Sequence, residues 1–418
     1  MTFPQAVRPL TAKANIIANT RLLLNRDNDM GNNHGITKEL AKVFAEVGGV
    51  SADEDINDWC NADLGSGVAI SPILAAKCLK ETLRTQVFIK GLYACLSEMV
   101  KVKKSINIVY AGTGPYGCLL LPLLTLFPQA PIRVWLIDIH QENIDSIEKI
   151  VRELEVEDQI AVIEKCDATK WHPSENVKFD LILSETMTAL LGKEPQVAIF
   201  AHVQQFLSND GVLVPQCIVL SAKLMPFESS KKQVQSLGDF FCLNKKTAGE
   251  IADGDFSCLQ GHITLPNPLS SFDYQTISFF TDIHVFGSHQ LSQHQCSLNT
   301  PVSYSGLKLE PGGLVHFHYL FNALPKFEFT FPIETMVEHI PSTEELGTIE
   351  LPGVKRFWHK TRLVGEGRHD RITTEKELSL EMDMLSHFGK RYQDALYYIC
   401  HFKPEFHEFE RWLLSENE

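Results

Sequence analysis

Apolar and polar residues follow different patterns in four successive regions of the chain. The first and last regions have the 3.6-residue period of helices, the second alternates short apolar runs with helical segments, and the third contains the two-residue period of half-buried strands. The predicted regions are a helical segment at 1–100, an alternating region at 101–224, a β-rich region at 225–345, and a mixed, then helical region at 346–418. We expect an α/β domain in the second region and a barrel-like domain in the third.

The alternating region predicts five strands with helices between them. The expected strands are 106–110, 132–137, 160–163, 179–183 and 211–214, and the expected helices are 119–127, 142–154 and 195–207. This β-α-β rhythm is typical of a doubly wound parallel sheet, a Rossmann-like fold. Ligands of such sheets bind beyond the carboxyl ends of the strands. Gly112, Asp138, Asp167 and Glu185 all fall at or just beyond those ends.

The flanking regions carry weaker signals. Ser71-Pro72 is a typical helix start, and the apolar spacing after it predicts one helix over 73–99. Residues 231–253 are expected to be helical or looped. Residues 327–331, in which phenylalanine alternates with polar residues, predict a half-buried strand, as do residues 314–321.

A glycine-rich loop, Gly112-Thr113-Gly114-Pro115-Tyr116-Gly117, follows the first strand and opens a predicted helix. Glycine lets the backbone approach a ligand closely, and a helix N-terminus presents free N–H groups. The spacing fits both a dinucleotide and a methyl donor. Asp138 ends the second strand, where a carboxylate can accept both hydroxyls of a ribose. NAD and S-adenosylmethionine share that ribose, so the loop and Asp138 leave both cofactors open.

Acidic residues also follow the third and fourth strands. Asp167 and Ala168 lie where a side chain can reach an adenine amino group, although Asp167 would equally suit a turn cap. Glu185 and Glu194 flank the next loop, which can bring both carboxylates onto one planar cation; guanidinium suits this arrangement. Such a clamp would orient a nitrogen for attack on a methylsulfonium. Alternatively, Glu194, which precedes Pro195, simply lies at a helix N-terminus.

The segment from about residue 106 to residue 224 resembles the catalytic core of protein arginine methyltransferases, particularly the symmetric-dimethylating type. The match is carried by Ala111-Gly112-Thr113-Gly114-Pro115, by the spacing of Glu185 and Glu194, and by Asn209-Asp210-Gly211-Val212-Leu213-Val214-Pro215. Upstream, Leu83-Arg84-Thr85 is similar to the helix whose arginine pairs with the cofactor carboxylate.

The resemblance implies S-adenosylmethionine as the cofactor, a β-barrel domain after residue 224, and a homodimer formed through an arm, for which 231–253 is a candidate. The predicted cofactor-binding residues are Arg84, Gly112, Thr113, Gly114, Gly117, Asp138, Asp167, Ala168 and Glu185, and the predicted catalytic residues are Glu185 and Glu194. We expect a methyltransferase that acts on a guanidine or amine nitrogen of a protein or a small molecule. A nicotinamide-dependent oxidoreductase and a non-catalytic scaffold with a decayed methyltransferase fold stay open.

The composition of the chain restricts the classes of partner, metal site and compartment that we expect. The net charge of −14 and the shortness of the basic run Lys101–Lys104 disfavour nucleic acid. The ten cysteines contain no CxxC pair, so we expect thiols in a reducing cytosol and neither a zinc ribbon nor a redox motif. No apolar run reaches the roughly 18–20 residues that span a bilayer. His316 and His318 lack a third ligand, so no metal site is predicted. We expect a cytoplasmic protein.

Overall fold

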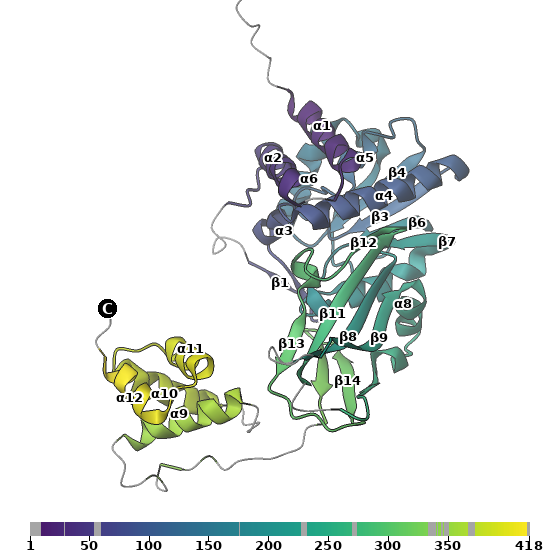
Figure 1. Cartoon of the computed structure of the whole chain (residues 1–418). Helices are drawn as coiled ribbons and strands as arrows, with labels where there is room; N and C mark the ends of the chain where they lie inside the picture. Colours follow the sequence, from purple (N-terminus) through teal and green to yellow (C-terminus); the bar gives the residue numbers. More distant parts are fainter. Residues whose placement is uncertain are drawn as a thin grey trace, which may run out of the picture.

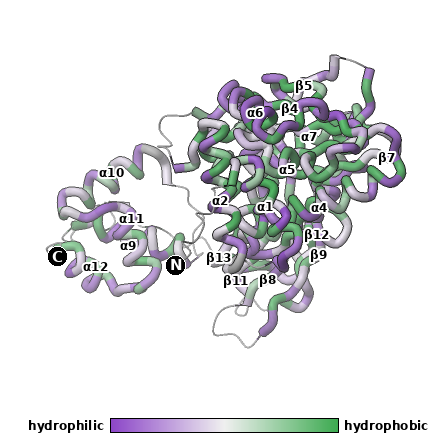
Figure 2. Tube along the Cα trace, turned by 90° about the horizontal axis from the view of Figure 1, so that it is seen from above, coloured by the Kyte–Doolittle hydropathy of each residue, from purple (hydrophilic) through white to green (hydrophobic). Residues whose placement is uncertain are grey.

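The residues that the structure describes fold around two separate hydrophobic cores, a large one that extends from Ile16 to Phe327 and a small one in the C-terminal helices. The computed structural model describes residues 10–28, 30–53, 60–174, 176–226, 232–269, 274–332, 340, 342, 343, 346, 351–366 and 373–415. Hydrophobic segments gather in the interior of the larger body and hydrophilic segments on outer helices such as α6 (Gln141–Leu154) (Figure 2).

The centre of the larger body is a five-stranded parallel sheet. Its strands are β3 (Ile106–Ala111), β4 (Ile132–Asp138), β5 (Ile160–Lys165), β6 (Phe179–Ser184) and β7 (Leu207–Val214), in the order β5-β4-β3-β6-β7. The α/β fold and all five predicted strands are confirmed. Because the order reverses between β3 and β6, a crevice is expected beyond their carboxyl ends. Ala111 pairs with both Ile137 and Ser184, so Gly112, Asp138 and Glu185 emerge at one level.

The connecting helices agree with the predictions less closely. They are α5 (Leu121–Leu124), α6 (Gln141–Leu154) and α7 (Gln196–Val203). The predicted helix over 119–127 is wrong in length, because α5 has four residues and the flanking N–H groups bond to carbonyls three residues back. Pro122 removes one N–H donor from this segment, which favours such tight turns over a regular helix.

The N-terminal region contributes helices and a short hairpin. These are α1 (Ala12–Asn25), α2 (Met30–Gly48), the hairpin β1 (Ala62–Asp63) and β2 (Val68–Ala69), α3 (Pro72–Cys78) and α4 (Thr82–Val102). The single helix predicted over 73–99 is therefore two helices. The break is held by Thr85, whose hydroxyl donates to the carbonyl oxygen of Leu79 at 3.1 Å. Arg84 lies in the first turn of α4, directly after this break.

The described residues of the β-rich region form two antiparallel sheets, with the helix α8 (Lys245–Ala252) beside β9 (Gln235–Asn244) (Figure 1). The first sheet contains β8 (Cys217–Pro226), β9, β11 (Tyr274–Phe286), β12 (His289–Leu291) and β13 (Val302–Ser305); the second contains β10 (Gln260–Thr264), β14 (Leu314–Leu320) and β15 (Lys326–Thr330). β8 pairs with β9 and β11, although residues 217–224 were assigned by sequence to the preceding domain. The expectation of helix or loop over 231–253 is wrong for β9, because pairing with β8 outweighs local propensity. The candidate arm is thus part of a sheet.

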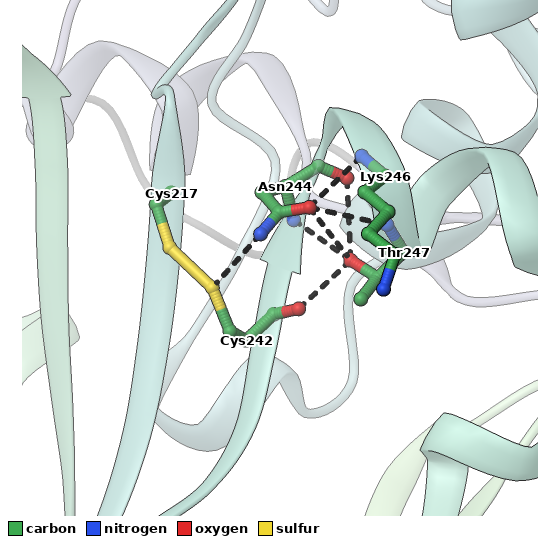
Figure 3. The surroundings of a disulfide bond; sticks show 5 residues. All are labelled: Cys217, Cys242, Asn244, Lys246 and Thr247. Atoms are coloured by element: carbon green, nitrogen blue, oxygen red, sulfur yellow. Dashed lines mark hydrogen bonds between the residues drawn. A yellow bond between two sulfur atoms is a disulfide. The ribbon is translucent and has the colours of Figure 1, made fainter.

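Two cysteines in this sheet are joined. Cys217 and Cys242 form a disulfide with α-carbons 6.5 Å apart (Figure 3). The expectation of thiols throughout is wrong for this pair, because adjacent strands bring the two residues together: Val219, two residues after Cys217, pairs directly with Cys242. The Asn244 amide donates to Cys242 Sγ at 3.3 Å, and its oxygen caps α8 (Figure 3). The start of β8 is thereby tied to the end of β9.

The C-terminal helices form a small bundle with its own core (Figure 1). They are α9 (Pro352–Gly365), α10 (Glu375–Ser386), α11 (Tyr392–Phe402) and α12 (Phe406–Leu414), which confirms the helical character predicted here. Phe357, Leu385, Ile399 and Phe409 fill the core. No helix in the described part of the chain is long and apolar enough to cross a membrane.

Candidate active site

A cavity lies beyond the carboxyl ends of β3, β4 and β6, where the strand order reverses. Eight of the ten predicted site residues line it: Arg84, Gly112, Thr113, Gly114, Asp138, Ala168, Glu185 and Glu194. These residues come from the first turn of α4, the glycine loop, the end of β4, the turn after β5 and the loop between β6 and α7. Gly117 and Asp167 do not line the cavity. Residues far apart in sequence thus converge because parallel strands end at one edge.

The glycine loop needs glycine for its backbone conformation. Gly112 and Gly114 have φ angles of +75° and +59°, in the left-handed region. A Cβ on Gly112 would lie 2.5 Å from Thr186 Cγ2, so the loop packs directly against the residue after Glu185. Gly117 has a different role, because a Cβ there would lie 2.8 Å from Leu121 Cδ1 and 2.9 Å from Ile147 Cδ1. It permits close packing beneath the loop rather than ligand contact.

Asp138 fastens the glycine loop to the end of β4. Its carboxylate accepts from the Gly114 N–H at 2.9 Å, the Thr113 hydroxyl at 3.4 Å, the His140 N–H at 3.0 Å and the Asn143 amide at 2.9 Å. A carboxylate has about four acceptor positions, so these contacts occupy it. The long Thr113 contact is the one that a ribose hydroxyl would replace most easily. The main role of Asp138 is therefore to hold the glycine loop, and few of its acceptor positions remain for a ligand.

Three buried polar atoms on the cavity wall lack partners among the described residues. They are His140 Nε2, Asn143 Oδ1 and Glu185 Oε1. Buried polar atoms normally find a hydrogen bond, so these three indicate a polar ligand. His140 and Asn143 were missed from sequence; the only signal was their position just after Asp138, at the start of an amphipathic helix.

Arg84 and Glu185 form a buried ion pair in the cavity. The Arg84 guanidinium contacts Glu185 Oε2, and both side chains are about 8% exposed. Glu81 Oε1 lies 3.6 Å from the same guanidinium. Burial raises the pKa of Glu185, and the positive charge of Arg84 opposes that rise. The arginine predicted to meet a cofactor carboxylate therefore holds one of the two predicted catalytic glutamates.

Glu194 is the second buried carboxylate. Its burial, together with the nearby charge of Glu185, raises its pKa from 4.5 to about 8. Only 7% of Glu194 is exposed. Glu194 does lie at a helix N-terminus, because Pro195 is the N-cap of α7, and it is at the same time buried in the cavity wall. Two carboxylates held together in this way favour a bound cation, which would relieve both the burial cost and their mutual repulsion.

Cysteines and apolar groups complete the wall. Burial raises the pKa of Cys78 to about 11 and that of Cys118 and Cys166 to about 12. These thiols stay protonated near neutral pH and act as small apolar groups rather than nucleophiles. In the described part of the chain, no three His, Cys, Asp or Glu side chains gather as a metal ion would require.

Asp167 takes the alternative role foreseen for it. Its carboxylate accepts from the Thr169 N–H at 2.9 Å and hydroxyl at 2.6 Å, and from Lys170 Nζ at 2.8 Å. These contacts cap a turn after β5. The neighbouring Ala168 lines the cavity instead. An adenine contact through Asp167 stays a prediction that the cavity does not support.

The short N-terminal hairpin covers one side of the site. Leu64, Ala69 and Ile70 line the cavity. A Cβ on Gly67 would lie 2.7 Å from the backbone nitrogen of Pro195, so the hairpin rests directly on the chain beside Glu194. These residues were not predicted from the sequence, because a two-residue strand gives no periodicity and its contacts lie far along the chain.

Comparisons with known proteins find similarity among solved structures. No family model matches the chain, and no curated protein matches it. Among solved structures, the chain is similar to the Trypanosoma brucei PRMT1 enzyme–prozyme heterotetrameric complex with AdoHcy. The identity is 15% and the TM-score 0.42, with 62% of this chain and 93% of that chain covered. The reaction of the present chain has to be inferred from its own site.

Proposed function

We propose that this protein is an S-adenosylmethionine-dependent methyltransferase acting on a guanidine or amine nitrogen. The observation that carries the proposal is the pair of buried carboxylates, Glu185 and Glu194, in a cavity at the switch point of a parallel sheet. A cationic acceptor suits this pair, and a guanidinium suits it best because its fork matches carboxylate geometry. The acceptor is a polypeptide arginine or a small molecule with the same group.

The cavity suits the proposed cofactor. The backbone of Gly112, Thr113 and Gly114 could lie along the cofactor, and Asp138 could accept from a ribose hydroxyl in place of its long contact with Thr113. Arg84 is the cation available for the cofactor carboxylate. S-adenosylmethionine would supply the methyl group on a sulfonium and carries no phosphate, so no basic cradle is required. Gly117 and Asp167 remain in the predicted set only as supports of the loop and the turn.

The protein's own groups would position the acceptor rather than react covalently. Glu185 and Glu194 would hold the guanidine so that its nitrogen faces the methyl group, and such orientation can supply on the order of 7–11 kcal/mol of a barrier. Burial and the charge of Glu185 raise the pKa of Glu194 to about 8. The positive charge of a bound guanidinium would lower this pKa again, so Glu194 would bind the acceptor as a carboxylate and could then take up the proton that the nitrogen releases. Arg84 would turn toward the cofactor carboxylate, which leaves Glu185 available to the acceptor.

The dinucleotide alternative fits the geometry less well. A pyrophosphate binds at a helix N-terminus with free N–H groups. Here the Gly114 N–H already donates to Asp138 at 2.9 Å, and α5 has only four residues. The two glutamates would also repel a pyrophosphate. The protein is therefore proposed as a methyltransferase rather than a nicotinamide-dependent oxidoreductase.

Thermal denaturation with two ligands tests this choice. We expect S-adenosylhomocysteine at 100 times its Kd to stabilise the fold by about 2.7 kcal/mol, because only the folded state has the cavity. We expect no shift with NADH. Stabilisation by NADH alone would refute the proposal, and no binding of either ligand at millimolar concentration would favour a scaffold.

A pH dependence follows from Glu194. Its folded pKa of about 8 exceeds the ordinary 4.5, so the folded state binds the proton more tightly than the unfolded state. The corresponding stability is complete below about pH 4.5 and is lost as pH rises to about 8. Relative to Glu194→Gln, wild type is expected to lose on the order of 5 kcal/mol across this window. Urea denaturation of both proteins at pH 5 and pH 8.5 measures this difference. An equal change in the free energy of unfolding between the two pH values in both proteins would contradict the burial of an ionisable Glu194.

A further inference from the structure

The loop that carries both glutamates has an unfavourable backbone. Between β6 and α7, the non-glycine residues Leu190, Leu191 and Lys193 have φ angles of +56°, +54° and +62°. Residues other than glycine disfavour this left-handed region. They keep such a conformation only where contacts with the surrounding structure enforce it. Glu194 follows Lys193 directly, so whatever holds these three residues also places Glu194.

The β-rich region contacts each of the three residues in turn. The Leu190 N–H donates to Thr281 Oγ1 at 3.0 Å, and the Tyr319 hydroxyl donates to the Leu191 carbonyl at 2.9 Å. The Lys193 N–H donates to the Pro325 carbonyl at 2.7 Å. Thr281 lies on β11 and Tyr319 on β14, so both antiparallel sheets take part.

Tyr319 is well suited to hold the loop. Its side chain is 7% exposed, and burial raises the pKa of its hydroxyl, which therefore stays a donor. The ring packs against Phe321 and Phe327, with centroids 5.2 and 4.9 Å away. A phenylalanine would keep these ring contacts and lose only the hydrogen bond.

We propose that Tyr319, assisted by Thr281, is a positioning residue of the active site: the β-rich region uses it to hold the strained loop and so to place Glu194. Tyr319 does not line the cavity, and it acts through the Leu191 carbonyl. The inference rests on the proposed function for its catalytic consequence. Its structural part, the hold on the loop, stands without that function.

The first test measures the loop itself. We expect Tyr319→Phe to increase hydrogen–deuterium exchange in the segment 186–195 by about fivefold, because local opening becomes easier. Thr281→Val, which leaves the Leu190 N–H without its acceptor, is expected to act in the same direction. Tyr274→Phe is the matched control, since it also removes a tyrosine hydroxyl bonded to a backbone carbonyl, that of Gln233. Unchanged exchange in both loop variants would overturn the proposal.

The second test separates positioning from general stability. With S-adenosylmethionine and a pool of arginine-containing peptides, we expect Tyr319→Phe to lower kcat about tenfold. The Kd for S-adenosylhomocysteine should stay within twofold. The acid limb of kcat/KM should lie at lower pH than in wild type, because a looser loop hydrates Glu194 and weakens the burial that raises its pKa. If wild type transfers no methyl group to these peptides or to a pool of small guanidines and amines, while exchange responds as expected, the hold on the loop stands and the proposed function fails. An unchanged pH profile with full activity would overturn the positioning role.

Discussion

Glu185→Gln is expected to reduce methyl transfer by about 10²–10³-fold, which is the scale of losing one preorganised electrostatic contact at a reacting group. A neutral amide cannot pair with a guanidinium as a carboxylate does, and the orientation of the acceptor nitrogen would be lost. Affinity for S-adenosylhomocysteine is expected to be unchanged or higher. The reason is that Glu185 holds Arg84, and its replacement releases the guanidinium for the cofactor carboxylate.

The same variant disturbs a buried ion pair, so stability must be followed alongside activity. Breaking such a pair can cost about 3–5 kcal/mol, although the glutamine oxygen can still accept from Arg84. Glu81→Gln is the matched control, because Glu81 lies 3.6 Å from the same guanidinium but is 30% exposed and outside the cavity. We expect it to keep activity within a few-fold in single-turnover assays. Wild-type turnover in Glu185→Gln would remove Glu185 from the mechanism, and equal losses in both variants would assign the effect to Arg84.

The parallel sheet was predictable because strands buried on both faces read as continuous apolar runs. The residues at the strand ends followed from the same pattern: once β3, β4 and β6 are assigned, Gly112, Asp138 and Glu185 must meet at one edge. Asp167 shows the limit of that reasoning. Its position beyond β5 suited either a ligand or a turn cap, and only its contacts with Thr169 and Lys170 distinguish them.

Contacts between distant segments were not predictable. The pairing of Arg84 with Glu185 joins α4 to the loop after β6, and no local pattern encodes which side chain a buried arginine meets. The same holds for the Cys217–Cys242 disulfide, which depends on the register of β8 and β9. The strand β9 was missed because its apolar residues do not alternate, and only pairing with β8 selects the extended conformation.

Gly114→Val is expected to weaken binding of S-adenosylhomocysteine by more than about 100-fold. The φ angle of Gly114 is +59°, where a β-branched residue is a severe outlier. A Cβ there would already lie 3.4 Å from the Ala75 Cβ, so the two valine methyl groups would extend into the cavity or against α3. The backbone would also have to move away from Asp138, to which the Gly114 N–H donates at 2.9 Å.

A second glycine separates this effect from backbone strain alone. Gly254 has a φ angle of +84°, and a Cβ there would meet nothing within 4 Å. Gly254→Val therefore imposes a similar conformational cost far from the cavity, and we expect it to lower the melting temperature while leaving the Kd for S-adenosylhomocysteine unchanged. Calorimetric titration of both variants distinguishes the two cases. Normal binding by Gly114→Val would mean that the glycine loop does not hold the cofactor. Equal loss in both variants would mean that global stability, rather than the shape of the loop, controls binding.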